Sequence, residues 1–482
     1  MNELRHSTSY TQSVHGLLRS IQDPNSAETL YAQAAAYFAH ADADKATIVH
    51  INGQIVLAKN VLQNTACQHQ QKTLTGQISK LNKRLEAERL RQNEQRLIRL
   101  DKAISVCLEI LSLSEGEDFE ETVHQSAKFL GTVLLLSPSQ SKTLSELHQR
   151  MKPAYKAVLS LRLLDKLMLD ELILNPYILE HYDWHKRYDA QNGNVVGFTQ
   201  SIILPIMMAA IFQDIGLEHP DLQAILEGDN KDAFRLLEPE KRKALLKQSY
   251  KQTQDYISNG LGCQKYSGNS LEEGREFEQQ EKMRLHFQQS LIKDAIVSKL
   301  GVGDIIKIPQ VYTSIVLSTK RSYQRQELPK AALLVEKLAQ KKIVSPQVAK
   351  AFIDIVGYFP QGYGVTYIPI DVRGFEGDGY EYAIVNRLYP KVPKEPICRK
   401  VTCQLSYISS GNTEVIKEQF NLRFESSRKK LTKVDKARLI EIMQKLVHQF
   451  EPADVANLIP AYWEPHEYFS DKRNQNLWSE SS

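Results

Sequence analysis

The chain has 482 residues, of which 42% are apolar and 24% are charged, so it is long enough for two or three packed domains. Lysine and arginine together number 61 against 57 acidic residues, and a net charge of +4 over this length gives no electrostatic basis for binding nucleic acid. The longest apolar run, SIILPIMMAAIF at 201–212, is too short to span a bilayer and predicts a buried helix without a membrane span.

The N-terminal region, residues 1–70, is expected to be a small α+β or helical region. Its first residues, MNELRHSTSYTQS, lack the pattern of a signal peptide, which predicts a cytoplasmic location. AETLYAQAAAYFAHA at 27–41 has helical spacing, whereas ATIVHINGQIVLAKN at 46–60 is typical of a β-hairpin that turns at Asn52-Gly53.

Residues 71–115 are predicted to form one long coiled-coil helix. Apolar residues recur at heptad spacing with one phase shift, and the stretch between them is almost wholly polar. We expect this helix to pair with a second copy of the chain through 74–111, giving a homodimer, and packing within the same chain is the alternative. The apolar positions are Ile78, Leu81, Leu85, Leu90, Leu97, Ile104 and Leu111.

Residues 116–403 are expected to be helical up to about 357 and then to form a small β extension. Ser270 and Glu273 make a capping box that opens a long polar helix. From 357 onward, aromatic and β-branched residues alternate between Gly and Pro turns, which predicts strands. Residues 404–482 are expected to hold an amphipathic helix at 432–450, opened by Thr432 and Asp435, and a polar tail.

The cysteines give no sign of a zinc ribbon or of a disulfide framework. They are odd in number, widely spaced and never arranged as CxxC, so we expect reduced thiols. The five are Cys67, Cys107, Cys263, Cys398 and Cys403.

Three motifs in a fixed order suggest a family. They are AAIFQDIG at 209–216, IIKIPQVYTSIVLSTKRSYQRQELPKAALLVEKL at 305–338, and FIDIVGYFPQGYGVTYI followed by AIVNRLYPKVPKEPICRKV at 352–401. With these motifs, the stretch from about 155 to 401 resembles an HD-GYP domain, the helical HD-superfamily domain whose active members hydrolyse the bacterial messenger cyclic di-GMP. The resemblance implies a mostly α HD-superfamily fold with a small β C-terminal extension.

The same resemblance assigns the metal-ligand positions, and most of them carry unsuitable residues. Such hydrolysis needs two or three metal ions that generate hydroxide and clamp the phosphate. The family's first histidine corresponds to His181, with His185 as an alternative. The His-Asp pair becomes Gln213-Asp214, a histidine becomes Ser249, and the last aspartate becomes Gln310. The paired histidines and the DGxGYP loop are not recognisable at 262–300.

We therefore interpret the chain as a catalytically inactive HD-GYP-like signalling or interaction protein, of bacterial type, with no cofactor. Asp214 is then an ordinary helix-end residue, and we expect Gln213 to make neutral hydrogen bonds in the vacated space. One alternative is an active cyclic di-GMP phosphodiesterase with an atypical iron or manganese site. Another is a silent nucleotide receptor that uses Lys320, Arg321 and Tyr323, although a solvated helix end is the favoured interpretation of these residues.

Overall fold

Helices account for 66% and strands for 5% of the described residues, which confirms a mostly α fold with a small C-terminal sheet. The chain folds into two compact units. The first comprises Met1–Arg19, Cys107–Ile211 and Ser290–Ser482, and the second comprises Ser20–Val106 and Phe212–Gln289. These discontinuous units differ from the four consecutive segments predicted above. The computed structural model describes residues 7–138, 143–173, 175–181, 187, 197–297, 301–371, 373–377, 379–431 and 459–479.

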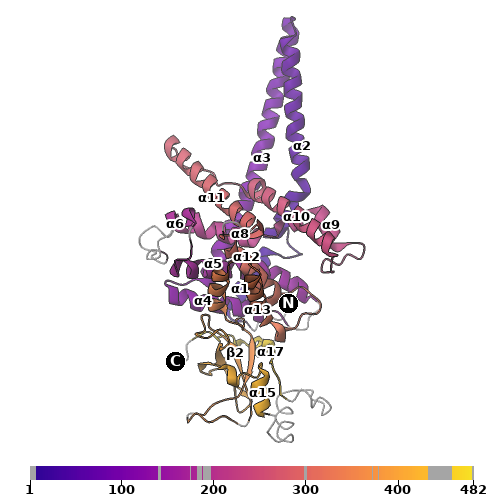
Figure 1. The fold of residues 1–482 in the computed structure, drawn as a ribbon. Coiled ribbons are helices and arrows are strands. Elements are labelled where there is room, and N and C mark those ends of the chain that lie inside the picture. Colours follow the sequence, from indigo (N-terminus) through magenta and orange to yellow (C-terminus); the bar gives the residue numbers. More distant parts are fainter. Residues whose placement is uncertain are drawn as a thin grey trace. The chain divides into compact units, whose positions relative to one another are not determined.

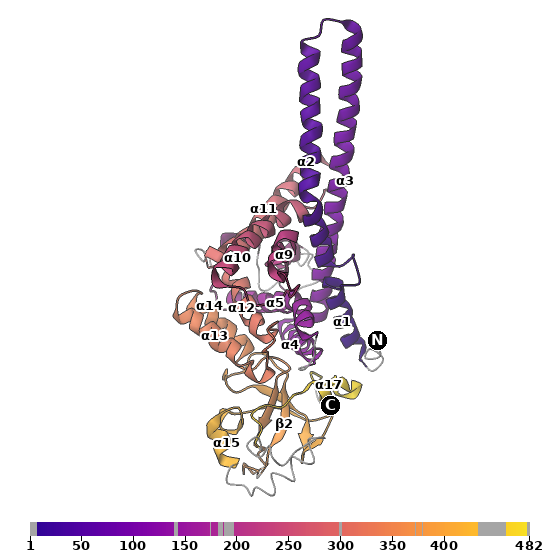
Figure 2. The ribbon, with the colours of Figure 1, turned by 90° about the vertical axis from the view of Figure 1, so that its right-hand side faces the viewer.

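The second unit is helical throughout its described part. Its two long helices, α2 and α3, run side by side and are joined at one end by a short connection (Figure 1, Figure 2). The shorter elements pack around the other end of α2, and η5 contacts α2, α9 and α10. The elements are α2 (Leu30–Gln63), α3 (Gln68–Ser114), η5 (Ile215–Glu218), α9 (Pro220–Glu227), α10 (Pro239–Asp255), η6 (Tyr256–Leu261) and α11 (Leu271–Val297), of which α3 and α11 continue into the first unit.

The β-hairpin predicted at 46–60 is wrong, because these residues lie inside α2. Asn-Gly favours a turn, but the flanking residues Ile48, Ile51 and Ile55 also have helical spacing and pack on one side of the helix. Burial of that face outweighs the local preference of Gly53, which costs a helix interior about 1 kcal/mol relative to Ala. The N-terminal region therefore contains no strand among its described residues.

The long helix predicted at 71–115 is confirmed as α3, and its described contacts in the second unit are with the same chain. Leu85 packs against Ile51 and Ile55 of α2. An ion pair joins Arg91 to Asp44 of α2 at 2.6 Å. The alternative of intramolecular packing thus holds for this part of α3, and pairing with a second copy stays a prediction.

The first unit is organised around α5, whose side chains from Ala154 to Leu164 are all buried. Helices α12, α14 and α4 pack against it. The apolar run at 201–212 forms most of η4 and all of α8 and is buried, as predicted. The helices are α1 (Ser9–Ile21), α4 (Phe119–Leu135), α5 (Leu144–Leu169), α6 (Pro176–His181), η4 (Thr199–Ile203), α8 (Leu204–Phe212), α12 (Asp304–Val316), η7 (Arg325–Glu327), α13 (Lys330–Gln340) and α14 (Pro346–Val356).

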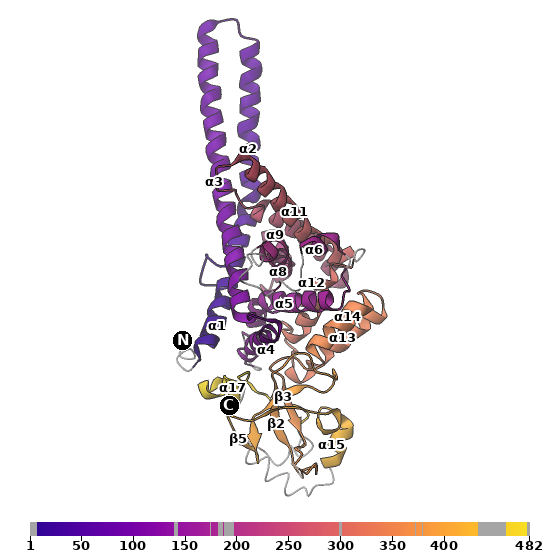
Figure 3. The same ribbon diagram turned by 90° about the vertical axis from the view of Figure 1, so that its left-hand side faces the viewer.

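The predicted β extension is confirmed, but it continues beyond residue 403 (Figure 3). An antiparallel sheet has the order β1-β2-β3-β6, and β4 and β5 form a separate ribbon. In the register, Val365 faces Ala383 and Cys398 faces Glu414. The strands are β1 (Gly364–Tyr367), β2 (Glu381–Val385), β3 (Ile397–Lys400), β4 (Thr402–Cys403), β5 (Ser406–Tyr407) and β6 (Thr413–Val415), followed by η8 (Glu418–Phe420) and α15 (Glu425–Leu431).

The C-terminal segment is not simply a polar tail. It contains α17 (His466–Ser470) and η10 (Lys472–Asn474), and Trp478 is fully buried in the first unit. Gly131 of α4 makes room for this indole, because a Cβ there would lie 2.2 Å from Cζ2 of Trp478. The helix predicted at 432–450, with its Thr432 and Asp435 cap, lies outside the described residues.

Two further expectations concern membranes and thiols. In the described part of the chain, no helix combines the length and apolar character needed to cross a bilayer. All five cysteines are free, and Cys107 and Cys398 are buried. The thiols are thus unpaired, as the spacing predicts.

Candidate functional site

The structure brings three of the predicted positions to one place in the second unit. Gln213 and Asp214 lead into η5, and η5 packs on α10, which carries Ser249. Gly216 permits the close approach, since a Cβ there would lie 2.0 Å from the carbonyl oxygen of Ser249. The Gly216 amide also donates to Oγ1 of Thr253 at 3.0 Å. The helix end and α10 therefore meet at a glycine that no other residue can replace without a shift.

This turn carries two acidic side chains, Asp214 and Glu218, close to buried groups. Burial raises the pKa of Glu218 to about 7. Burial, together with the negative charge of Asp214, holds the pKa of Tyr31 well above its ordinary value. Oε1 of Gln213 is buried and accepts no hydrogen bond from the described residues. The expectation that Gln213 compensates through neutral hydrogen bonds is therefore wrong for its carbonyl oxygen, and such an atom costs about 1–3 kcal/mol.

Gln310, in the first unit, accepts a hydrogen bond from a buried lysine. Lys156 of α5 donates from Nζ to Oε1 of Gln310 on α12 at 2.9 Å, and Lys156 is only 2% exposed. A fixed positive charge therefore occupies the neighbourhood of the position that the family resemblance assigns to a metal ligand. Two like unit charges about 4 Å apart repel each other by about 4 kcal/mol near a protein surface. The repulsion between an ammonium group and a divalent cation at the same distance is twice as large.

His181 ends α6 and makes only local contacts among those recorded. Its Nδ1 lies 2.9 Å from the carbonyl oxygen of Tyr177, and its ring packs on the Tyr177 ring at 4.5 Å. His185 lies outside the described residues. Within the described residues, no three His, Cys, Asp or Glu side chains gather into a group able to hold a metal ion.

The predicted nucleotide-binding residues lie in the segment that follows α12. Lys320 and Arg321 are exposed there. The hydroxyl of Tyr323 donates to the carbonyl oxygen of Val316 at 2.9 Å, and its ring meets His148 edge-on at 4.8 Å. Tyr323 is thus engaged within the fold.

Sequence reasoning missed the buried arginines of the first unit. Arg325, two residues after Tyr323, pairs with Glu464 at 2.6 Å and donates to the carbonyl oxygen of Leu134 at 2.8 Å. Arg162 lies in the apolar face of α5 and pairs with Asp165 at 2.9 Å. The one available signal was the charged pair at i and i+3 inside an otherwise apolar helix.

A second network joins Arg162 to residues outside α5. Arg162 and Arg187 both contact Oε1 of Glu115 at 2.5 Å, and Arg187 also reaches Asp165 at 3.2 Å. Two guanidinium groups and two carboxylates balance each other's charge, which is the condition for burying them. This cluster is structural and offers no open coordination position.

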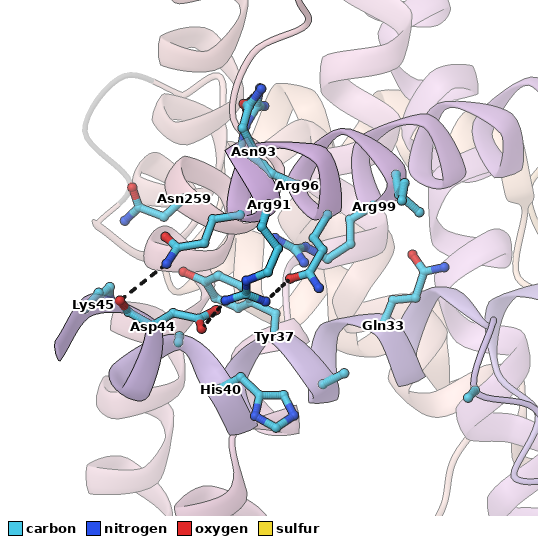
Figure 4. A pocket seen from close by; sticks show the side chains of 16 residues that line it. Gln33, Tyr37, His40, Asp44, Lys45, Arg91, Asn93, Arg96, Arg99 and Asn259 are labelled. Carbon is cyan, nitrogen blue, oxygen red and sulfur yellow. Dashed lines mark hydrogen bonds and ion pairs between the residues drawn. The ribbon is translucent and has the colours of Figure 1, made fainter. Parts of the chain in front are cut away.

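The second unit contains a cleft of about 710 Å³ between α2 and α3 (Figure 4). Tyr37 and Lys45 of α2 line it, together with Arg96 and Arg99 of α3 and with Asn259 of η6. The arginines belong to the polar stretch 83–102, whose charges look in the sequence like those of any solvated helix face.

The charges around the cleft are unequally neutralised. Arg91 pairs with Asp44 and with Glu88, each at 2.6 Å, and Lys45 pairs with Asp255 at 3.2 Å. Arg96 and Arg99 instead donate to backbone carbonyl groups. Arg91 and Lys45 are therefore neutralised by carboxylates. In the described structure, Arg96 and Arg99 form no ion pair with a carboxylate.

Comparison of the chain with family models, with curated proteins and with solved structures finds no match. The HD-GYP resemblance consequently depends on the quoted motifs alone.

Proposed function

We propose that this chain is a catalytically inactive, HD-GYP-like signalling or protein-interaction module. The observation that carries the proposal is the contact between Lys156 and Gln310. The Lys156 ammonium is a covalently attached cation, and it lies beside the position where the family resemblance expects a metal ligand. A divalent ion would have to displace that ammonium or tolerate its repulsion.

The arrangement at η5 supports the same proposal. Gly216 lets the turn that follows Gln213-Asp214 approach Ser249 closely. Of these three side chains only Asp214 carries a charge suited to a metal, and a single carboxylate without imidazole support is a weak site. A donor set this poor supports an inactive module.

The test is hydrolysis by the full-length protein. Purified protein is incubated with cyclic di-GMP and with manganese, or with ferrous iron under anaerobic conditions, and the linear product is measured by chromatography. We expect no turnover above that of a matched Asp214→Ala variant. Turnover by the wild type that disappears in Asp214→Ala would contradict the proposal and would favour an active enzyme with an atypical metal site.

Metal analysis of the same preparations supplies an independent readout. We expect iron and manganese far below one equivalent in the wild type and in Gln213→His, since one added imidazole leaves Ser249 and Gln310 unable to complete the ligand set. Uptake of a full equivalent by Gln213→His would show instead that the site lacks only this one ligand.

The nucleotide-receptor alternative has less support. The Tyr323 hydroxyl is occupied by the carbonyl of Val316, and Lys320 and Arg321 lie on an exposed turn. Binding of cyclic di-GMP that is lost in Arg321→Gln would nevertheless favour it over a pure interaction module.

A further inference from the structure

Arg99 is the least satisfied cation of the cleft. Its Nε donates to the carbonyl oxygen of Gly260 at 2.9 Å, and its guanidinium carbon lies 5.0 Å from the centre of the Tyr37 ring. In the described structure no carboxylate pairs with it, and no other acceptor is recorded for its two terminal nitrogens. The Gly260 carbonyl and the Tyr37 ring thus engage Nε and one face of the guanidinium. Because Arg99 lines the cleft, we infer that its two terminal nitrogens are available to a ligand there.

Arg96, one turn earlier, adds a second positive charge in a fixed position. Its Nη1 donates to the carbonyl oxygens of Leu261 and Cys263, each at 2.6 Å, and its Nη2 donates to Oδ1 of Asn93 at 2.9 Å. Glu281 acts on Arg96 only through space and is itself bonded to Arg284 at 2.5 Å. Burial lowers the pKa of both Arg96 and Arg99, so the fold holds two partly desolvated cations together.

The cleft also presents apolar surface beside these cations. Ile98 lines it with 60% of its surface exposed, and Ala36 contributes a small side chain that leaves space. The ring of Tyr37 lies in the same cleft, as Figure 4 shows. A volume of about 710 Å³ falls within the range of sites for small organic ligands.

We propose that this cleft binds a small organic phosphate, with the phosphate on Arg99 and near Arg96 and the carbon framework against Tyr37 and Ile98. A phosphate dianion supplies the two negative charges that the recorded contacts of the two guanidinium groups lack, and it matches the planar fork of arginine. Asp44, the acidic residue that lines the cleft, forms its ion pair with Arg91 and acts on Arg99 only through space. The proposal does not depend on the loss of hydrolysis, because none of its residues is at a metal-ligand position.

The test uses phenyl phosphate as the probe, with the full-length protein and titration calorimetry at pH 8. Inorganic phosphate lacks the ring, and benzoate has the ring but carries one charge. We expect saturable binding of phenyl phosphate, with an affinity roughly tenfold above that of either comparison compound. Absence of saturable binding at millimolar phenyl phosphate, or equal binding of benzoate, would overturn the proposal.

Three variants locate the binding. Arg99→Gln should weaken phenyl phosphate binding at least roughly tenfold, and Ala36→Phe should weaken it by filling the cleft without removing a hydrogen bond. Arg89→Gln changes an exposed arginine of the same helix that does not line the cleft and should leave binding unchanged. Melting temperatures verify that each variant is folded. Retained binding in a folded Ala36→Phe protein would place the ligand elsewhere and overturn the assignment.

A lipid headgroup is the other source of the same phosphate chemistry. Sedimentation with vesicles containing phosphatidic acid distinguishes the two sources. We expect no Arg99-dependent pelleting, since a cleft of this volume suits a small soluble ligand. Pelleting that Arg99→Gln abolishes would overturn the assignment to a soluble phosphate.

Discussion

Lysine 156 shows how one side chain changes the chemistry that a position can perform. An amide at Gln310 is a weak metal ligand, but it is a good acceptor for an ammonium group, and Lys156 lies on the facing helix. The sequence places these residues 154 positions apart and offers no sign that they meet. The degenerate ligand position stays a prediction, and the partner of Gln310 could be known only from the packing of α5 on α12.

A double-mutant cycle tests this contact. Gln310→Leu removes an acceptor of a buried ammonium and should lower the free energy of unfolding by about 1–3 kcal/mol. Lys156→Met with Gln310→Leu removes both polar partners and should recover part of that loss, because the charge is no longer buried. Urea denaturation followed by circular dichroism measures the wild type, Gln310→Leu, Lys156→Met and the double variant. A double variant less stable than Gln310→Leu alone would contradict the argument.

Glu218 predicts a pH dependence at the η5 turn. Its pKa rises from 4.5 to about 7 on folding, so between these values the folded state binds more protons than the unfolded chain. The loss of folding stability caused by ionising this buried carboxyl group is absent below about pH 4.5 and complete above about pH 7. Since the side chain is partly exposed, we expect a full penalty of about 1–3 kcal/mol.

Glu218→Gln removes that penalty. The melting temperature of the variant should exceed that of the wild type at pH 8, and the difference should shrink as the pH falls toward 5. Glu240→Gln, on the exposed surface of α10, is the matched control for loss of one acidic charge. A difference that is constant with pH, or that grows on acidification, would show that Glu218 is not held in a desolvated environment.

Helix α2 illustrates the limits of local sequence signals at the scale of an element. Asn52-Gly53 between apolar stretches is a strong hairpin signal, yet Ile48, Ile51 and Ile55 satisfy helical spacing equally well. The helix is favoured over the hairpin because Leu81 and Leu85 of α3 cover that face of α2. By contrast, the strands after residue 357 were predictable because alternation and turn residues there agree with each other.

Two glycines give opposite predictions for substitution by alanine. Gly53 is exposed within α2, and a Cβ would meet no atom within 4 Å, so Gly53→Ala should stabilise the protein by about 0.5–1 kcal/mol. Gly216→Ala should destabilise it by more than about 2 kcal/mol, because its Cβ would lie 2.0 Å from the Ser249 carbonyl oxygen. Thermal unfolding of the two variants compares them directly. Destabilisation by Gly53→Ala would indicate a turn at this position instead of a helix.

At the scale of the whole molecule, the fold class was predictable and the composition of the two units was not. Periodicity gives the helices because each must bury one face, whatever its partner is. The second unit assembles from 20–106 and 212–289, and the cleft takes Asn259 from the later of these segments. Which distant segments meet depends on complementary surfaces, and a single sequence does not display those. The arginine cleft was missed for this reason, since its charges resemble any solvated helix face until α2 is placed beside them.

The predicted homodimer follows from the apolar surface that remains on the α2 and α3 hairpin. Leu85 is buried against α2, but Val56 and Leu57 of α2 and Leu90 of α3 are 56%, 66% and 57% exposed. Two such hairpins from two copies of the chain could bury these residues together as a four-helix bundle, a packing that hairpins of this kind commonly adopt. We therefore expect α2 to contribute to the interface beside the predicted seam on α3.

Light scattering on the full-length protein at tens of micromolar tests this assembly. We expect the mass of a dimer for the wild type and of a monomer for Val56→Glu combined with Leu57→Glu, whose like charges would face each other across the interface. Lys59→Glu alters an exposed residue two positions away and should remain dimeric. Both variants should keep the helical content of the wild type, since none of the three side chains is buried in the single chain. A monomeric wild type would refute the dimer, and a dimeric double variant would move the interface away from the hairpin.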